Sequence, residues 1–294
     1  MQRYAFPLPS GEISVCHWRD GPQDGRPVLH WAHANGFNGQ TYDPLLAPLA
    51  ARFDIHGWDA RGHGMSSLPA WPDKLRSWAI YRNDLEKLVA HLAAQAGAKI
   101  WLGGHSMGGC ASILLAAKRP DLVAGLVLTD PVVMPTFSAI VSPLLMALRG
   151  RGHPLMELAK KRRAQWPDKQ TITAAYTGRG AFASWQDGFL DAYLDGGLLP
   201  LLGDAENQLR LACDPKWEAA NFKGPQMDVV RWIKKLRLPF TLMMAEKGST
   251  TRAVAAFEAA RADKKIYPVA GSTHFVPMEF PDLVREEIIA RISG

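Results

Sequence analysis

Short apolar runs separated by amphipathic stretches recur along most of the chain, and they predict alternating strands and helices. Buried strands are expected at residues 27–32, 53–58, 99–103, 123–129, 239–245 and 265–269. Apolar residues three or four positions apart predict helices at residues 42–52, 78–96, 109–117, 253–262 and 281–292. Earlier strands at 2–6 and 12–18 would pair in antiparallel fashion. Strands that alternate with helices in this way are typical of a parallel, doubly wound α/β sheet.

The alternation stops between residues 132 and 236. This stretch has no clear strand, but Leu, Met, Trp and Tyr residues recur in it at helical spacing. We therefore expect a helical cap, or lid, over the carboxyl edge of the sheet. The α/β core would then comprise residues 1–131 and 237–294, and the cap residues 132–236.

One glycine-rich motif lies between a predicted strand and a predicted helix. It reads Gly104-His105-Ser106-Met107-Gly108, and Gly-x-Ser-x-Gly in this context is typical of a nucleophile elbow. The glycines at both ends permit a sharp turn, so that the Ser106 hydroxyl projects above the sheet. The backbone N–H of Met107, in the first helical turn, would face a developing oxyanion.

A serine nucleophile needs a general base, and the base needs an acid that orients it. His274 follows the last predicted strand, at the same edge of the sheet as Ser106, and is the preferred base among the histidines. Asp130 ends the strand after the elbow helix and is the preferred acid. Glu246 is the alternative acid, because it follows the strand at 239–245, and a dyad without an acid also stays open.

Two further loops lie at the carboxyl ends of predicted strands. The loop at residues 33–39 is expected to supply the second oxyanion donor, the backbone N–H of Phe37. The loop at residues 59–67 is expected to be structural, with Asp59 and Arg61 satisfying each other and nearby backbone groups. In this interpretation His63 is a structural histidine.

Composition narrows the class of protein. Hydrophobic residues make up 47% of the chain and charged residues 21%, as in soluble globular proteins. No apolar run is long enough to span a bilayer, and the N-terminus lacks the unbroken apolar core of a signal peptide. Three cysteines without Cys-x-x-Cys spacing suggest a reduced, cytoplasmic protein without a structural metal site.

The net charge of +6 is mild, and its densest source is Lys160-Lys161-Arg162-Arg163. A solvated helix face is the expected role of this cluster, and contact with an anionic surface or an acyl carrier is the alternative. Nucleic-acid binding is not expected, because no aromatic platform or binding motif accompanies the charge. The expected partner is a small acyl substrate, without stable membrane insertion.

Taken together, the motifs resemble the α/β-hydrolase superfamily over essentially the whole chain. The resemblance rests on residues 33–37, 59–64, 104–109 and 271–277. It implies a mostly parallel eight-stranded sheet, a helical cap after the sixth strand, and catalysis by a nucleophile, an acid and a histidine. Gly248 falls where most members carry the acid, whereas Asp130 falls where haloalkane-dehalogenase-like members carry theirs. Those members and the epoxide hydrolases use an aspartate nucleophile, so Ser106 argues against both activities.

The leading interpretation is a cofactor-independent serine hydrolase that acts on carboxylic esters or thioesters. An apolar acyl pocket under the cap is expected to involve Leu144, Leu145, Met146, Trp166, Trp185, Phe189 and Trp217. The alternatives on the same triad are a C–C bond hydrolase, a lactonase and a cofactor-free perhydrolase. A non-catalytic binding protein on this scaffold is disfavoured, because both Ser106 and His274 are present.

Overall fold

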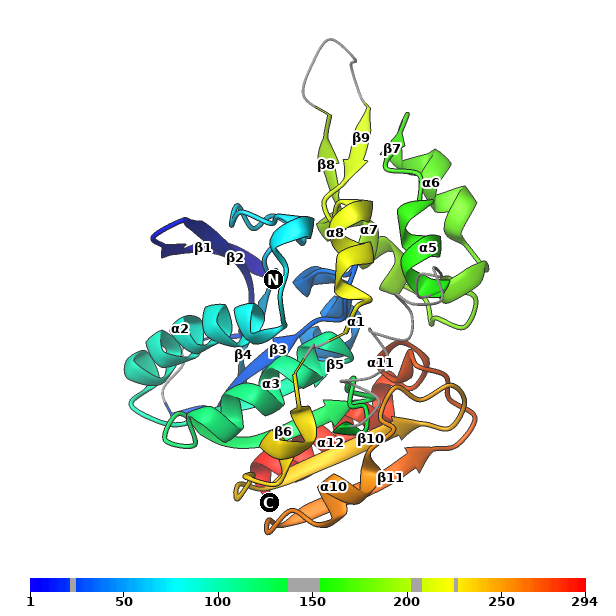
Figure 1. Ribbon diagram of the computed structural model, residues 1–294. Coiled ribbons are helices and arrows are strands. Elements are labelled where there is room, and N and C mark those ends of the chain that lie inside the picture. Colours follow the sequence, from blue (N-terminus) through cyan, green and yellow to red (C-terminus); the bar gives the residue numbers. More distant parts are fainter. Residues whose placement is uncertain (22–24, 137–153, 202–207, 225–226) are drawn as a thin grey trace.

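The computed structural model describes residues 1–21, 25–136, 154–201, 208–224 and 227–294. At its centre lies an eight-stranded sheet with the order β1-β2-β4-β3-β5-β6-β10-β11 (Figure 1). The strands are β1 (Gln2–Leu8), β2 (Gly11–Trp18), β3 (Val28–Ala32), β4 (Asp54–Trp58), β5 (Ile100–His105), β6 (Val123–Thr129), β10 (Phe240–Ala245) and β11 (Lys264–Val269). Strand β2 pairs antiparallel with both β1 and β4, and all the other pairings in this sheet are parallel. The predicted α/β sheet is confirmed.

Helices cover both faces of this sheet, which explains why its central strands read as continuous apolar runs. One face packs against α2 (Ala79–Ala96), α3 (Met107–Lys118) and α10 (Val254–Glu258), with α9 (Val229–Ile233) on the outer side of α3. The other face packs against α1 (Asp43–Leu46), α11 (Val276–Glu279) and α12 (Pro281–Ser293). The core is therefore two apolar layers, one on each side of the sheet.

The helix predicted at residues 42–52 is broken in the structure. A 3₁₀ turn, η1 (Gly39–Tyr42), leads into the four residues of α1, and a second turn, η2 (Ala47–Leu49), follows. Pro44 and Pro48 each lie in the first turn of a new element, where a missing N–H costs least. The apolar residues Leu45, Leu46 and Leu49 are buried, but the prolines divide the segment into short turns.

The segment between β6 and β10 is not purely helical. Its helices are α5 (Pro154–Lys160), α6 (Lys169–Tyr176), α7 (Phe189–Gly197) and α8 (Pro215–Asn221), followed by α9. They accompany a small antiparallel sheet of β7 (Gln165–Trp166), β9 (Leu209–Leu211) and β8 (Leu198–Pro200). The expectation of no strand here was wrong, because strands of two or three residues are too short to show alternation.

This inserted segment lies over the carboxyl edge of the large sheet, above the strands in Figure 1. Two side chains from the loop after β3 tie it down: Asn35 donates to the Glu218 carbonyl at 3.0 Å, and Asn38 donates to the Tyr193 carbonyl at 3.0 Å. Leu144, Leu145 and Met146, which were expected in an acyl pocket, lie outside the described residues. Within the described ranges, no helix has both the length and the apolar character needed to cross a bilayer.

Candidate active site

Ser106 occupies the sharp turn between β5 and α3. Its backbone angles are φ 56° and ψ −116°, a conformation that a non-glycine residue rarely adopts. The Ser106 N–H donates to the Thr129 carbonyl at 3.1 Å, which holds the turn against β6. A Cβ atom at Gly108 would overlap the Ala32 carbonyl, and one at Gly104 would overlap the Gly108 backbone. The two glycines thus permit the turn for the reason that the sequence suggested.

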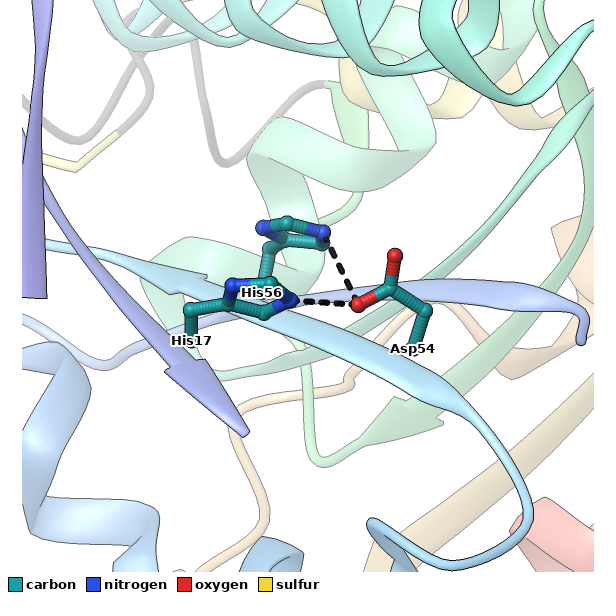
Figure 2. A group of neighbouring side chains, drawn as sticks. All are labelled: His17, Asp54 and His56. Carbon is teal, nitrogen blue, oxygen red and sulfur yellow. Dashed lines mark hydrogen bonds and ion pairs between the residues drawn. The ribbon is translucent and has the colours of Figure 1, made fainter. Parts of the chain in front are cut away.

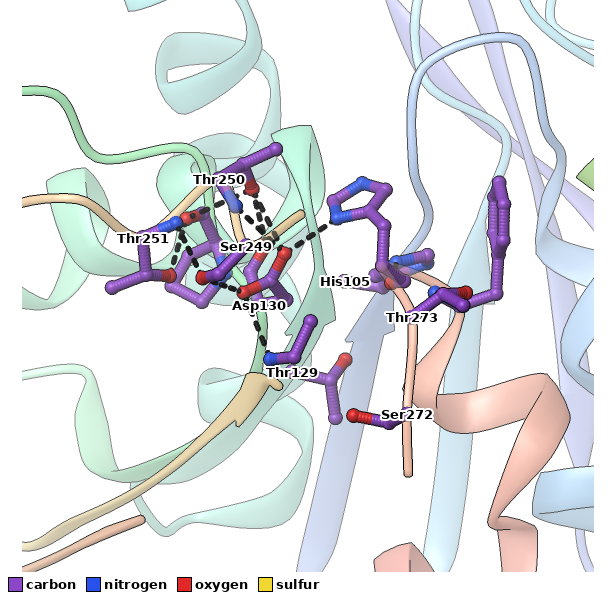
Figure 3. Close-up of polar contacts among 12 residues, drawn as sticks. His105, Thr129, Asp130, Ser249, Thr250, Thr251, Ser272 and Thr273 are labelled. Carbon is purple, nitrogen blue, oxygen red and sulfur yellow. Dashed lines mark hydrogen bonds and ion pairs between the residues drawn. The ribbon is translucent and has the colours of Figure 1, made fainter. Parts of the chain in front are cut away.

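His274 and Asp130 come together at the same edge. The His274 Nδ1 lies 2.6 Å from Asp130 Oδ2, although 144 positions separate the two residues. The Asp130 carboxylate is fully buried and accepts further hydrogen bonds from Ala245 N–H, from Ser249 Oγ at 2.5 Å and from Thr250 N–H at 2.9 Å (Figure 3). Burial opposes ionisation, but the hydrogen bonds from His274, Ser249 and Thr250 outweigh it and lower the pKa of Asp130 to about 2. Asp130 is therefore an anion at neutral pH.

Glu246, the alternative acid, has another partner. Its Oε2 accepts a hydrogen bond from Gly271 N–H at 2.9 Å, and its own N–H donates to Ser272 Oγ at 3.1 Å. These contacts brace the loop that carries His274 without reaching the imidazole. The geometry thus puts Asp130, and not Glu246, against His274.

Among the described residues, the structure shows no hydrogen bond between Ser106 and His274. Catalytic hydrogen bonds are often long without substrate and tighten when it binds. The His274 side chain is 23% exposed, whereas Ser106 is 7% exposed.

The two expected oxyanion donors differ in their present partners. Met107 is the first residue of α3, so its N–H has no acceptor within the helix. The Phe37 N–H donates to the Ala34 carbonyl at 3.1 Å, closing a turn in which Gly36 has φ 79°. A substrate oxyanion would therefore have to share the Phe37 N–H with Ala34 or take it over.

His105 connects the turn of residues 34–37 to His274 through a buried chain of hydrogen bonds. The Ala34 N–H donates to the Tyr42 hydroxyl at 3.1 Å, and that hydroxyl lies 2.8 Å from His105 Nδ1. His105 Nε2 lies 2.8 Å from the His274 carbonyl, which can only accept. Burial lowers the pKa of His105 to about 3, so the ring is neutral, donates from Nε2 and accepts from Tyr42 at Nδ1. Sequence reasoning placed His105 beside the elbow but had no signal for Tyr42.

In the loop at residues 59–67, the expectation that Asp59 and Arg61 pair was wrong. Asp59 accepts from Arg3 at 2.7 Å and from Gly39 N–H at 2.7 Å, whereas Arg61 forms a bidentate pair with Asp84 at 2.9 Å. Arg3, Gly39 and Asp84 lie far away in the sequence, and only the fold brings them close. The expected contacts with nearby backbone are present: Asp59 accepts from Met65 N–H at 2.9 Å, and Arg61 donates to the Pro69 carbonyl at 2.8 Å. His63 is buried and bonds to this loop's own backbone, as a structural histidine does.

The segment inserted between β6 and β10 places an ion pair and a group of aromatic rings beside the turn of residues 34–37. Arg162 donates to Glu218 at 2.5 Å and to the Tyr193 hydroxyl at 2.7 Å, and a Cβ atom at Gly36 would overlap the Glu218 carboxylate. The expected role of the basic cluster as a solvated face therefore fails for Arg162. The Phe37 ring lies 5.3 Å from that of Trp185 and 5.6 Å from that of Tyr193.

Of the other described residues expected in an acyl pocket, three are core residues. Phe189 packs in the layer under α12, Trp217 packs against the α2 layer, and Trp166 packs within the inserted segment. Of these four residues, Trp185 contacts the rings beside the turn of residues 34–37, where it also lies 5.8 Å from Phe275.

Comparisons with known proteins agree with this architecture. A family model described as serine aminopeptidase, S33 matches residues 24–177. The 2-(acetamidomethylene)succinate hydrolase of Mesorhizobium japonicum is 27% identical over 265 residues, which cover 89% of this chain and 86% of that protein. Lipase LipV of Mycobacterium tuberculosis is 36% identical over 170 residues, which cover 57% of this chain and 56% of the lipase.

Among solved structures, E-2-(acetamidomethylene)succinate hydrolase aligns with a TM-score of 0.75 at 21% identity, over 100% of this chain and 99% of that one. That likeness concerns the fold alone. Together with the family match, it establishes the architecture and the hydrolase class. The chain belongs to the serine aminopeptidase S33 family of α/β-hydrolases.

Proposed function

We propose that this hydrolase cleaves carboxylic esters or thioesters through an acyl-enzyme on Ser106. The observation that supports it best is the 2.6 Å contact between His274 Nδ1 and the buried Asp130 carboxylate, at the edge where Ser106 follows β5. A carboxylate on Nδ1 keeps the proton there, so that Nε2 is free to act as the base.

In the proposed reaction His274 Nε2 removes the Ser106 hydroxyl proton as Oγ attacks the carbonyl carbon. The carbonyl oxygen becomes negative and accepts hydrogen bonds from the N–H groups of Met107 and Phe37. The C–O or C–S bond then breaks, and the leaving group takes the proton from His274. Water attacks the acyl-enzyme by the same steps in reverse, which frees the acid and restores Ser106.

The aromatic rings beside the turn of residues 34–37 would receive the acyl group. The Phe37 ring lies against Trp185, Tyr193 and Phe275, with 6.2 Å between the centroids of the nearly parallel Phe37 and Phe275 rings. These flat apolar surfaces favour a hydrophobic acyl group of limited width.

Initial rates with p-nitrophenyl esters from acetyl to palmitoyl test this proposal. We expect turnover that falls by about 10⁴-fold or more in Ser106→Ala, and the preferred chain length would measure the space beside the aromatic rings. Turnover that survives in Ser106→Ala would contradict the proposal. Halide oxidation with peroxide and acetate would indicate a perhydrolase instead, and activity confined to lactones or C–C substrates would indicate those alternatives.

A second candidate substrate is a substituted succinate, because the relative that matches 89% of this chain is a 2-(acetamidomethylene)succinate hydrolase. Arg162 would then exchange its ion pair with Glu218 for a substrate carboxylate. Direct assay of 2-(acetamidomethylene)succinate with wild type and Arg162→Gln tests this candidate. Turnover that needs Arg162 would support it, and turnover of neutral esters alone would refute it.

A further inference from the structure

A second group of polar side chains lies near the amino ends of β3 and β4, away from the carboxyl edge of the large sheet. Asp54 is the first residue of β4 and pairs with Val28, the first residue of β3, whereas Ala32 at the other end of β3 pairs with Gly104 of the elbow. At about 3.3 Å per residue, the length of β3 separates the two ends by roughly 13 Å. This group therefore lies outside the proposed catalytic machinery.

Strand register brings two histidines and this aspartate together. His17 of β2 lies directly opposite His56 of β4, and Asp54 lies two positions before His56 on the same face. The His17 Nε2 is 2.5 Å from Asp54 Oδ1, and the His56 Nε2 is 3.3 Å from the same oxygen (Figure 2). All three potential ligand atoms lie within 4.8 Å of one another. Their side chains are 15%, 10% and 7% exposed for His17, Asp54 and His56, so a small ion can reach them.

We propose that His17, Asp54 and His56 bind one divalent transition-metal ion of the zinc class. Two imidazole nitrogens and one carboxylate oxygen suit Zn²⁺, Co²⁺ or Ni²⁺, whereas Mg²⁺ and Ca²⁺ prefer oxygen ligands throughout. Three protein ligands leave at least one coordination position for water.

The spacing of the ligand atoms is close to what such an ion needs. At Zn–N and Zn–O distances of about 2.0–2.2 Å, neighbouring ligands in a tetrahedral site lie about 3.3 Å apart. The His56–Asp54 separation already has this value, while the His17–Asp54 separation of 2.5 Å is that of a hydrogen bond. The two rings are stacked, with centroids 4.3 Å apart and planes 14° apart. Metal binding therefore requires the His17 ring, the most exposed of the three side chains, to turn and move outward by roughly 0.8 Å.

Tyr4 supports the site. Its hydroxyl lies 3.1 Å from His56 Nδ1 and can accept that N–H when Nε2 binds the metal, which holds the ring with its Nε2 lone pair available as a ligand.

Titration of the whole 294-residue chain, first stripped with EDTA, tests the proposal. Co²⁺ is added while its visible d–d absorption is followed, and Zn²⁺ is then added to displace it. We expect saturation at one equivalent, binding at least ten times weaker in His17→Gln and in Asp54→Asn, and unchanged binding in the matched control His91→Gln. His91 is exposed on α2 and is not one of the three proposed ligands.

Thermal unfolding gives a second readout. Zn²⁺ at about 100 times its dissociation constant should raise the Tm by about 4 °C in wild type and in His91→Gln, but not in the ligand variants. Wild-type protein that binds no stoichiometric Co²⁺ would overturn the proposal. So would Co²⁺ binding that is equal in wild type, His17→Gln and Asp54→Asn. Neither result depends on ester turnover.

Discussion

Replacing Asp130 with Asn tests which acid orients His274. Two backbone donors that cannot rotate flank this carboxylate: Ala245 N–H lies 3.1 Å from Oδ1, and Thr250 N–H lies 2.9 Å from Oδ2. An asparagine must therefore point its NH₂ group at one of these N–H groups, whichever way the amide is turned. Leaving one buried donor without an acceptor costs about 1–3 kcal/mol of the free energy of unfolding.

The catalytic cost of Asp130→Asn follows from the same geometry. If the amide nitrogen takes the place of Oδ2, it faces His274 Nδ1 at the present 2.6 Å contact, and the imidazole proton must move to Nε2. The ring then presents N–H to Ser106 and cannot accept its proton. If the nitrogen takes the place of Oδ1, the tautomer survives but the negative charge is lost. We expect kcat to fall by up to about 10⁴-fold.

Glu246→Gln is the matched control for this prediction. Glu246 is exposed, and a glutamine oxygen can still accept the Gly271 N–H, so kcat should change by less than about threefold. Steady-state kinetics with the best p-nitrophenyl ester and urea unfolding of each variant supply the measurements. A large loss in Glu246→Gln together with near-normal turnover in Asp130→Asn would refute our reasoning.

Three more predictions concern the histidines, the buried chain and the cap. Burial lowers the pKa values of His30, His33, His63 and His105 to about 3 to 4, so these four histidines are neutral in the folded protein and bind protons once it unfolds. The free energy of unfolding should therefore fall steeply below about pH 6.5, by up to about 5 kcal/mol per pH unit near pH 5. Urea unfolding at pH 7.0 and 5.5 measures this, and equal stability at both would contradict it. Tyr42→Phe removes two hydrogen bonds of the chain to His105 and should lower kcat about tenfold with KM nearly unchanged, whereas a change in KM alone would argue against a positioning role. Trp185→Ala should raise KM for long-chain esters about tenfold and leave acetyl esters unaffected, and a uniform effect across chain lengths would count against contact between Trp185 and the acyl group.

Local chemistry explains what could be predicted from the sequence. The elbow could be predicted because the steric demands on Gly104 and Gly108 arise within one strand–turn–helix unit. Asp130 and His274 could be proposed because parallel strands bring their carboxyl ends to one edge. The order of strands and helices in the core could be predicted because the spacing of apolar residues is also a local property of the chain.

The features that escaped prediction depend on partners far away in the chain. Asp59 pairs with Arg3 and Arg61 with Asp84, and no spacing rule connects either pair. The contact between His17 and His56 depends on the register of β2 against β4, and a sequence shows neither the pairing nor the register. Arg162 reads as one of four surface cations until the fold turns it toward Glu218.

Labelling with a fluorophosphonate tests the central claim most directly. The probe reacts covalently with a serine that a base activates, and peptide mass spectrometry locates the adduct. We predict one adduct, on Ser106, in wild-type protein, and its loss in Ser106→Ala and in His274→Ala. Folded wild-type protein that stays unlabelled, or labelling that persists in Ser106→Ala, would contradict the account of Ser106 as the nucleophile.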